Sequence, residues 1–316
     1  MYSKKEDLVT MAKSSKKLPN FIWATILLLI FMFGGQIIGG ICIIPIYLTV
    51  YMSRGMSSNL SLLELFINLS SFLFIALLVF VRVKYIEKRK ISTLGFSKDS
   101  WLKKYTKGFL IGFAMMATVV LILFVFGCVS VEKNPSQPVG IAALGGVMII
   151  LIGWMIQSAT EEILTRGWLM NVLAARYNKV FALIFSSTIF GIMHLFNPDV
   201  NYIAVINIIL VGIFYGIYVI KTNDLWAVCG MHAAWNFAQG NIFGFEVSGI
   251  NVAVSSIFDF NLVGSGTISG GVFGPEAGLI ATFVLLSSII IVYILDKKGY
   301  FIKNKNKVQV NVNREK

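Results

Sequence analysis

Long apolar runs alternate with short polar segments along most of this chain. A run of about 20 residues is long enough to cross a bilayer as a helix. Such runs lie near residues 20–50, 60–82, 108–131, 140–170, 180–197, 201–220, 225–243 and 276–295. The pattern predicts an all-α protein, a polytopic membrane bundle of about eight transmembrane helices. In the first run, Gly35 and Gly39 form a GxxxG pattern, which permits close packing of helices.

Composition and charge agree with a membrane protein. The 316 residues are 57% hydrophobic and 13% charged, whereas a soluble domain carries about 25% charged residues. The net charge of +12 lies mainly between the apolar runs, which indicates contact with the lipid bilayer and no nucleic acid. With eight spans and both termini cytoplasmic, 24 of the 27 Lys and Arg residues face the cytoplasm, as the positive-inside rule requires. The Ile-, Asn- and Lys-rich composition favours a bacterial plasma membrane.

The runs divide the chain into consecutive segments. From the N-terminus these are a basic cytoplasmic segment (1–19), the first transmembrane helices (20–138) with a basic cytoplasmic loop (84–107), a helical core (139–243), an outer Gly-rich loop (244–275), a last transmembrane helix (276–295) and a basic cytoplasmic tail (296–316).

Two of these segments allow more than one interpretation. Residues 84–107 form either an ordinary basic loop or an arm that lies on the lipid surface. Residues 244–275 form either a flexible outer loop or a re-entrant one. No Lys-Ser or Lys-Thr follows their glycines, so a phosphate loop is excluded. The three cysteines lie in apolar runs without metal-type spacing, and we expect buried thiols without disulfides.

One charged motif interrupts an otherwise apolar run. Glu161, Glu162 and Arg166 lie within six residues of one another, although each charge at bilayer depth costs at least about 2.5 kcal/mol. Four-residue spacing places Glu162 and Arg166 on one helical face, where they can pair. Glu161 is turned away by about 100°. It is therefore a carboxylate without a local partner.

The only two histidines also lie in apolar runs. His194 follows Phe190 by four residues, and His232 precedes Asn236 by four, so each pair shares a helical face. Counted from the nearest basic residues at a rise of about 1.5 Å per residue, Glu162 and both histidines lie at a similar depth. We therefore expect a carboxylate, two imidazoles and an amide to meet between three helices.

These residue types suit the hydrolysis of a buried bond. A carboxylate and a neutral imidazole can hold and deprotonate a water molecule. A second imidazole and an amide can donate hydrogen bonds to an oxyanion. Alternatively, Glu161, His194 and His232 are a reasonable ligand set for a divalent metal such as zinc, although no HExxH motif is present.

The order EExxxR, FxxxH and HxxxN resembles the CPBP family, also called the Abi or CAAX-protease family. The three motifs here are Glu161-Glu162 with Arg166, Phe190 with His194, and His232 with Asn236. The resemblance covers about residues 150–240. It implies an intramembrane endopeptidase, metal-dependent or metal-free, that cleaves a membrane-embedded or lipidated peptide. It also implies that Glu161 and His194 activate the water, that His232 and Asn236 form the oxyanion site, and that Glu162 and Arg166 brace it.

Two other classes of function are compatible with buried polar groups. A membrane scaffold or bacteriocin-immunity protein would keep them for fold specificity, and its role would survive Glu161→Ala. A proton-coupled transporter would use them as a relay. No internal repeat or pair of broken helices supports the transporter.

Overall fold

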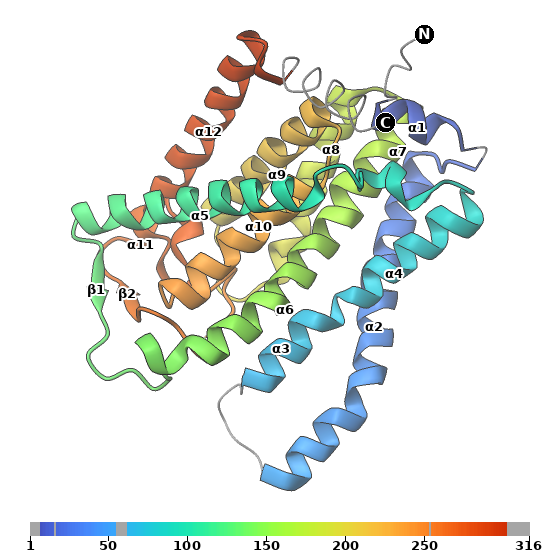
Figure 1. Ribbon diagram of the computed structural model, residues 1–316. Helices are drawn as coiled ribbons and strands as arrows, with labels where there is room; N and C mark the ends of the chain where they lie inside the picture. Colours follow the sequence, from blue (N-terminus) through green and yellow to red (C-terminus); the bar gives the residue numbers. More distant parts are fainter. Residues whose placement is uncertain (1–6, 16, 55–61, 253, 302–316) are drawn as a thin grey trace.

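The computed structural model describes residues 7–15, 17–54, 62–252 and 254–301. In this part of the chain, seven helical spans are long and apolar enough to cross a membrane. They are Phe21–Thr49, Leu62–Ile86, Trp101–Val125, Gly140–Arg176, Lys179–Phe196, Tyr202–Thr222 and Leu279–Lys297. Figure 1 shows them packed as one helical bundle. The predicted all-α, polytopic membrane fold is confirmed.

The spans are built from α-helices and from π-helical or 3-10 segments, which are designated η. They contain α2 (Phe21–Arg54), α3 (Leu62–Ser71), α4 (Leu73–Val81), η1 (Arg82–Ile86), α5 (Trp101–Val125), η3 (Gly140–Ala143), α6 (Leu144–Glu162), η4 (Ile163–Leu169), α7 (Met170–Arg176), α8 (Lys179–Met193), η5 (His194–Phe196), α9 (Tyr202–Thr222) and α12 (Leu279–Lys297). The other elements are α1 (Leu8–Lys13), η2 (Ile91–Leu94), β1 (Val129–Val131), α10 (Trp226–Phe237), η6 (Ala238–Ile242), β2 (Phe260–Leu262), α11 (Gly266–Ser269), η7 (Gly271–Phe273) and η8 (Pro275–Ala277).

Helix α10 occupies the predicted run at 225–243. Its 12 residues continue into the 5 residues of π-helical η6, so the whole helix is shorter than each of the seven spans. Residues 227–237 are all buried. The eighth predicted span is therefore an interior helix.

Small residues let α10 approach α5 closely. A Cβ atom on Gly108 of α5 would overlap the carbonyl oxygen of Ala227 in α10. A Cβ atom on Gly112, one turn later, would overlap the carbonyl oxygen of Met231. Because the two backbones touch, this contact fixes the rotation and depth of the helix that carries His232.

The polar segments that bear most basic residues meet at one end of the bundle. Lys179 Nζ lies 2.8 Å from Asp7 Oδ2, which joins α1 to the start of α8. Lys221 at the end of α9 pairs with Asp296 at the end of α12. In Figure 1, α1 and the C-terminal end of α12 lie at the same end of the molecule. The cytoplasmic placement of this end stays a prediction.

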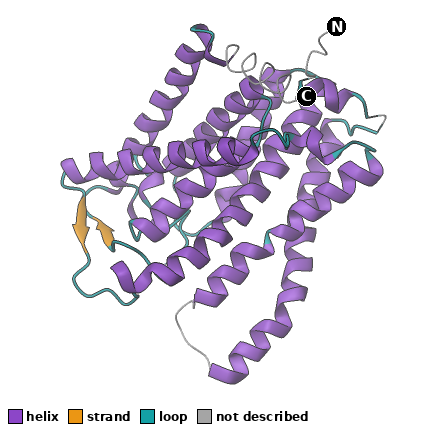
Figure 2. Cartoon of the chain, viewed as in Figure 1, coloured by secondary structure: helices purple, strands orange, loops and turns teal. Residues whose placement is uncertain are grey.

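The two segments expected as loops contain more structure than their hydropathy indicated. Helix α5 begins at Trp101, inside the predicted loop 84–107. Its first turns are rich in lysine, which lowers their hydropathy although the chain is helical. Residues 244–275 contain β2, α11 and η7, and β2 pairs antiparallel with β1, as the orange arrows of Figure 2 show. Several of their apolar side chains, including Phe245 and Phe273, are buried.

The cysteines form no disulfide. Cys128 and Cys229 are buried, as expected. Cys42 is exposed on α2, which corrects the expectation for that residue. The exposed face of α2 is apolar, with Ile41 and Ile44 more than half exposed, so a thiol lies there among side chains suited to lipid.

Candidate active site

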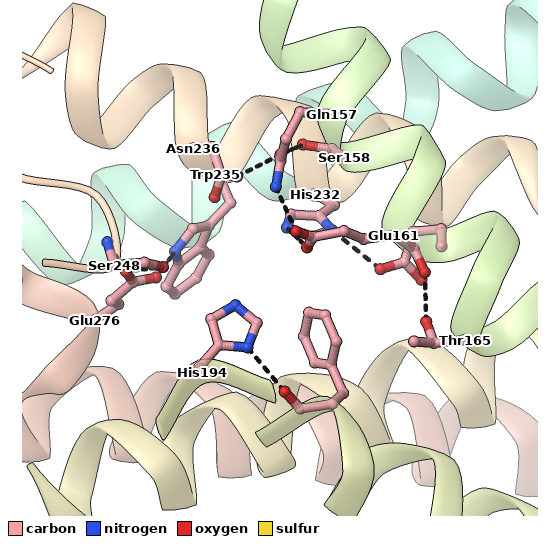
Figure 3. Close-up of polar contacts among 12 residues, drawn as sticks. Gln157, Ser158, Glu161, Thr165, His194, His232, Trp235, Asn236, Ser248 and Glu276 are labelled. Carbon is pink, nitrogen blue, oxygen red and sulfur yellow. Dashed lines mark hydrogen bonds and ion pairs between the residues drawn. The ribbon is translucent and has the colours of Figure 1, made fainter. Parts of the chain in front are cut away.

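Three helical elements bring the predicted polar residues together. Glu161 lies in the last turn of α6, His194 begins η5 directly after α8, and His232 and Asn236 lie in α10. Figure 3 shows the four side chains around one space in the interior of the bundle. Directly after Glu162 the helix widens into π-helical η4, a local form that is frequent at functional sites.

Glu162 holds two other residues of the site. Its Oε1 accepts a hydrogen bond of 2.8 Å from the Arg166 guanidinium and lies 3.0 Å from His232 Nδ1. The side chains of Glu162 and Arg166 are fully buried, and the guanidinium lies 4.2 Å from the centre of the Phe190 ring. Gly212 leaves room for it, since a Cβ atom there would lie 2.9 Å from Arg166 Nη2. The pair expected from four-residue spacing is present, and it also contacts a histidine.

Glu161 points to a different side of the helix. Its Oε1 accepts a hydrogen bond of 2.6 Å from Gln157 Nε2. Its Oε2 is buried without a hydrogen-bond partner and lies 3.8 Å from His232 Nε2. A separation of 3.8 Å is too long for a hydrogen bond, and one water molecule can bridge it.

His194 is oriented by the backbone of its own helix. Its Nδ1 lies 2.8 Å from the carbonyl oxygen of Phe190, so Nδ1–H donates and Nε2 is the acceptor in the neutral ring. Among the described residues no hydrogen bond or ion pair joins Glu161 to His194. The histidine beside Glu161 is His232, which changes the pairing implied by the motifs.

Gln157 links Glu161 to Asn236. Its Oε1 accepts hydrogen bonds from Asn236 Nδ2 at 3.3 Å and from Ser158 Oγ at 3.1 Å, while its Nε2 donates to Glu161. Sequence reasoning missed this residue. The available signal was its position one helical turn before Glu161, on the same face.

A third carboxylate reaches the site from the far end of the chain. Glu276 Oε1 accepts hydrogen bonds from the Ser248 backbone N–H at 2.6 Å and from Ser248 Oγ at 2.9 Å. Glu276 Oε2 accepts one from Trp235 Nε1 at 3.3 Å. No local pattern around Glu276 indicates this position, because the path of the intervening segment is not readable from hydropathy.

A cavity of about 30 Å³ lies between these groups, lined by Phe190, His194, Asn207, Ile208, Val211, Tyr215, His232, Trp235, Asn236, Ser248, Glu276 and Leu285. About 10–15 Å³ of such enclosed space is enough to hold one water molecule. The arrangement can therefore hold a water molecule among imidazole, amide and carboxylate groups.

The described residues contain no group of three His, Cys, Asp or Glu side chains placed to hold a metal ion. Glu161 and His232 are close, but His194 does not join them in a ligand set. The zinc site expected as an alternative does not fit this arrangement.

Comparisons with known proteins agree with the motifs. Residues 143–238 match the model of a family described as type II CAAX prenyl endopeptidase Rce1-like. The uncharacterized protein YyaK of Bacillus subtilis (strain 168) is 28% identical over 234 residues, which cover 69% of this chain and 76% of YyaK. No solved structure matches the chain. Residues 143–238 of this multi-pass membrane protein are therefore similar to the Rce1-like domain of the CPBP family.

Proposed function

We propose that this protein is an intramembrane endopeptidase that hydrolyses a peptide bond of a membrane-associated or lipidated peptide with a water molecule activated by Glu161. The Rce1-like match supports a CAAX-type protease at the level of the family. The observation that carries the proposal is the Oε2 atom of Glu161, which is buried without a hydrogen-bond partner and lies 3.8 Å from Nε2 of His232, a residue that lines the cavity.

Glu161 acts as the general base. It takes a proton from the water as the water oxygen attacks the carbonyl carbon, and returns it to the leaving amine as the carbon–nitrogen bond breaks. The bond from Gln157 to Oε1 leaves Oε2 as the basic atom. His194, whose Nε2 is an acceptor, orients the water from the opposite side of the site.

Asn236 and His232 support the oxyanion. Asn236 Nδ2 has two hydrogens and gives one to Gln157, so the second remains for the substrate. His232 Nε2 donates only when its ring is protonated, because Nδ1–H is directed at Glu162. The charged ring then faces the carboxylates of Glu162 and Glu161. Glu162 and Arg166 are positioning residues in this scheme.

The proposal is tested with purified full-length protein in detergent and a library of fluorogenic apolar peptides, with and without a prenylated C-terminal cysteine. Glu161→Gln should lower kcat/KM by about 10²–10⁴-fold, the usual contribution of a general base. Glu132→Gln is the matched control, because Glu132 lies outside the site and its hydrogen bonds go to Asn134 and Asn261. Its activity should equal that of the wild type.

Equal cleavage by the wild type and Glu161→Gln would disprove the assignment of the base. Retained immunity or signalling by Glu161→Gln in cells would favour the non-enzymatic scaffold instead. Dialysis against o-phenanthroline decides the metal question. Activity that survives supports the metal-free scheme, and activity lost and restored by zinc would replace it with a metal-dependent one.

A further inference from the structure

Glu276 reaches the cavity from outside the family-matched domain. It lies in η8, whereas the Rce1-like match ends at residue 238. Its carboxylate lines the same cavity as His194, His232 and Asn236, and only 9% of the residue is exposed. Figure 3 shows Glu276 and Glu161 on opposite sides of the site, with Trp235 and His194 between them.

The site holds three carboxyl groups, from Glu161, Glu162 and Glu276, and one arginine. Arg166 is paired with Glu162. In the described part of the chain, no Lys or Arg forms an ion pair with Glu161 or Glu276. A buried carboxylate without a cation is costly, and such a site attracts a positive group and repels a second carboxylate.

Glu276 also keeps room for a further hydrogen bond. An ionised carboxylate has about four acceptor positions. Three are used, two by Ser248 on Oε1 and one by the Trp235 indole on Oε2, and the last of these bonds is long at 3.3 Å. Oε2 is therefore the atom that can exchange or add a donor from a bound peptide.

We propose that Glu276 is a specificity residue that receives a protonated amine of the peptide substrate, from a lysine side chain or the amino terminus, close to the scissile bond. The inference rests on the proposed peptidase function and names the charge of its substrate. Glu276 lines the same cavity as His232 and Asn236, the groups assigned to the oxyanion.

The test uses one apolar fluorogenic peptide in which a single lysine is moved along the sequence. Each lysine peptide is compared with its acetyl-lysine counterpart, and each is made with a free and an acetylated amino terminus to separate the two sources of the amine. For wild type we expect KM at least about tenfold lower for the lysine or free-amine peptide at one position. Glu276→Gln should bring this ratio close to one by raising KM for the lysine or free-amine peptide.

Two controls separate the charge of Glu276 from its structural bonds. Ser248→Ala removes one hydrogen bond to Glu276 and keeps the carboxylate, so it should retain the preference. Trp235→Phe removes the indole donor and keeps an aromatic ring, and it should retain the preference as well. Melting temperatures of all variants in detergent establish that they are folded.

A wild-type ratio near one at every position would overturn the inference, whether or not Glu276→Gln folds. An unchanged preference in Glu276→Gln, or an equal loss of kcat on all peptides, would also overturn it. Binding to Glu161→Gln, measured by displacement of a fluorescent lysine peptide, provides a readout without turnover. Charge-dependent binding without any cleavage by wild type would refute the peptidase and keep the amine site.

Discussion

Two buried clusters of carboxylate and arginine lie on the two sides of segment η4, and they differ in how completely the carboxylate is used. Glu87 Oε2 accepts from Arg89 Nε at 2.8 Å, and Glu87 Oε1 accepts from Trp168 Nε1 at 2.8 Å. The second cluster, in the candidate active site, consists of Glu161, Glu162 and Arg166. Its atoms Glu161 Oε2 and Glu162 Oε2 have no hydrogen-bond partner.

The difference distinguishes a structural carboxylate from one available for chemistry. Both oxygens of Glu87 are engaged, its charge is paired with Arg89, and it does not line the cavity. Glu161 keeps a free oxygen 3.8 Å from Nε2 of His232, which lines the cavity. Similar residue types therefore have different consequences, because the Glu87 carboxylate is paired with an arginine away from the cavity, whereas Glu161 keeps a free oxygen beside a cavity-lining histidine.

The largest expected effect on stability comes from removing the carboxylate of the Glu87–Arg89 cluster. Glu87→Ala leaves Arg89 buried without its carboxylate, and we expect the free energy of unfolding to fall by about 3–5 kcal/mol. Titration with denaturing detergent measures this loss, and cleavage per folded molecule should change little. Glu161→Gln should show the reverse, with activity lost and stability kept. A Glu87→Ala protein as stable as wild type would contradict the structural assignment.

The next effect concerns the orientation of the free carboxylate. Gln157→Ala removes the hydrogen bond to Glu161 Oε1 and the link to Asn236. A hydrogen bond to a charged group contributes about 1.5–3 kcal/mol, so we expect kcat to fall by about 10–100-fold with KM nearly unchanged. Ser158→Ala is the control, because it removes a different bond to Gln157 and should cost little. A loss that appears only in KM would contradict a positioning role.

A third prediction tests whether the contact between α5 and α10 positions His232 relative to Glu161 and Glu162. Gly112→Ala puts a Cβ atom into the carbonyl oxygen of Met231, the residue before His232. We expect α10 to shift, with a loss of about 1–3 kcal/mol in unfolding free energy and reduced kcat. Gly40→Ala is the control, since nothing lies within 4 Å of a Cβ atom there. Equal behaviour of the two variants would show that the α5–α10 contact does not set the site.

Part of this arrangement was predictable from the sequence. Apolar runs located the spans, and depth along the helices predicted that Glu162, His194 and His232 would lie close together. The GxxxG pattern of Gly35 and Gly39 predicted close packing, and a Cβ atom on Gly35 would lie 2.7 Å from Ile75 Cα. Such local patterns are readable because helical geometry fixes the spacing of side chains along each helix.

The remaining features depend on contacts between distant segments. The motifs did not reveal that His232 lies beside Glu161, because the rotation of α10 is set by its contact with α5. Glu276 lies 40 residues after Asn236, and only the fold of the segment between them brings it to the cavity. The start of α5 at Trp101 was missed because its lysines resemble a loop in hydropathy. The catalytic roles stay predictions until the variants are measured.

The smallest expected effect comes from the partly exposed ion pair of Asp7 and Lys179, with which the stability effects of the two buried clusters can be compared. Burial raises the pKa of Asp7, but hydrogen bonds from Lys179 and Thr10 outweigh it and lower the pKa from 3.8 to about 2. A carboxyl group whose pKa is lower in the folded than in the unfolded state stabilises the fold at pH values above its unfolded-state pKa. This contribution is lost as the pH falls from 3.8 towards 2.

Asp7→Asn should therefore lower the melting temperature slightly near pH 6. Lys179 and Asp7 side chains are 47% and 33% exposed, so solvent screening limits the pair to about 1 kcal/mol or less. The difference from wild type should shrink as the pH falls through 3.8 and vanish only below 2, and added salt should reduce it at pH 6. A difference that persists well below pH 2, where Asp7 is neutral, would show that its charge is not the cause, since asparagine can still accept the capping bond from Thr10.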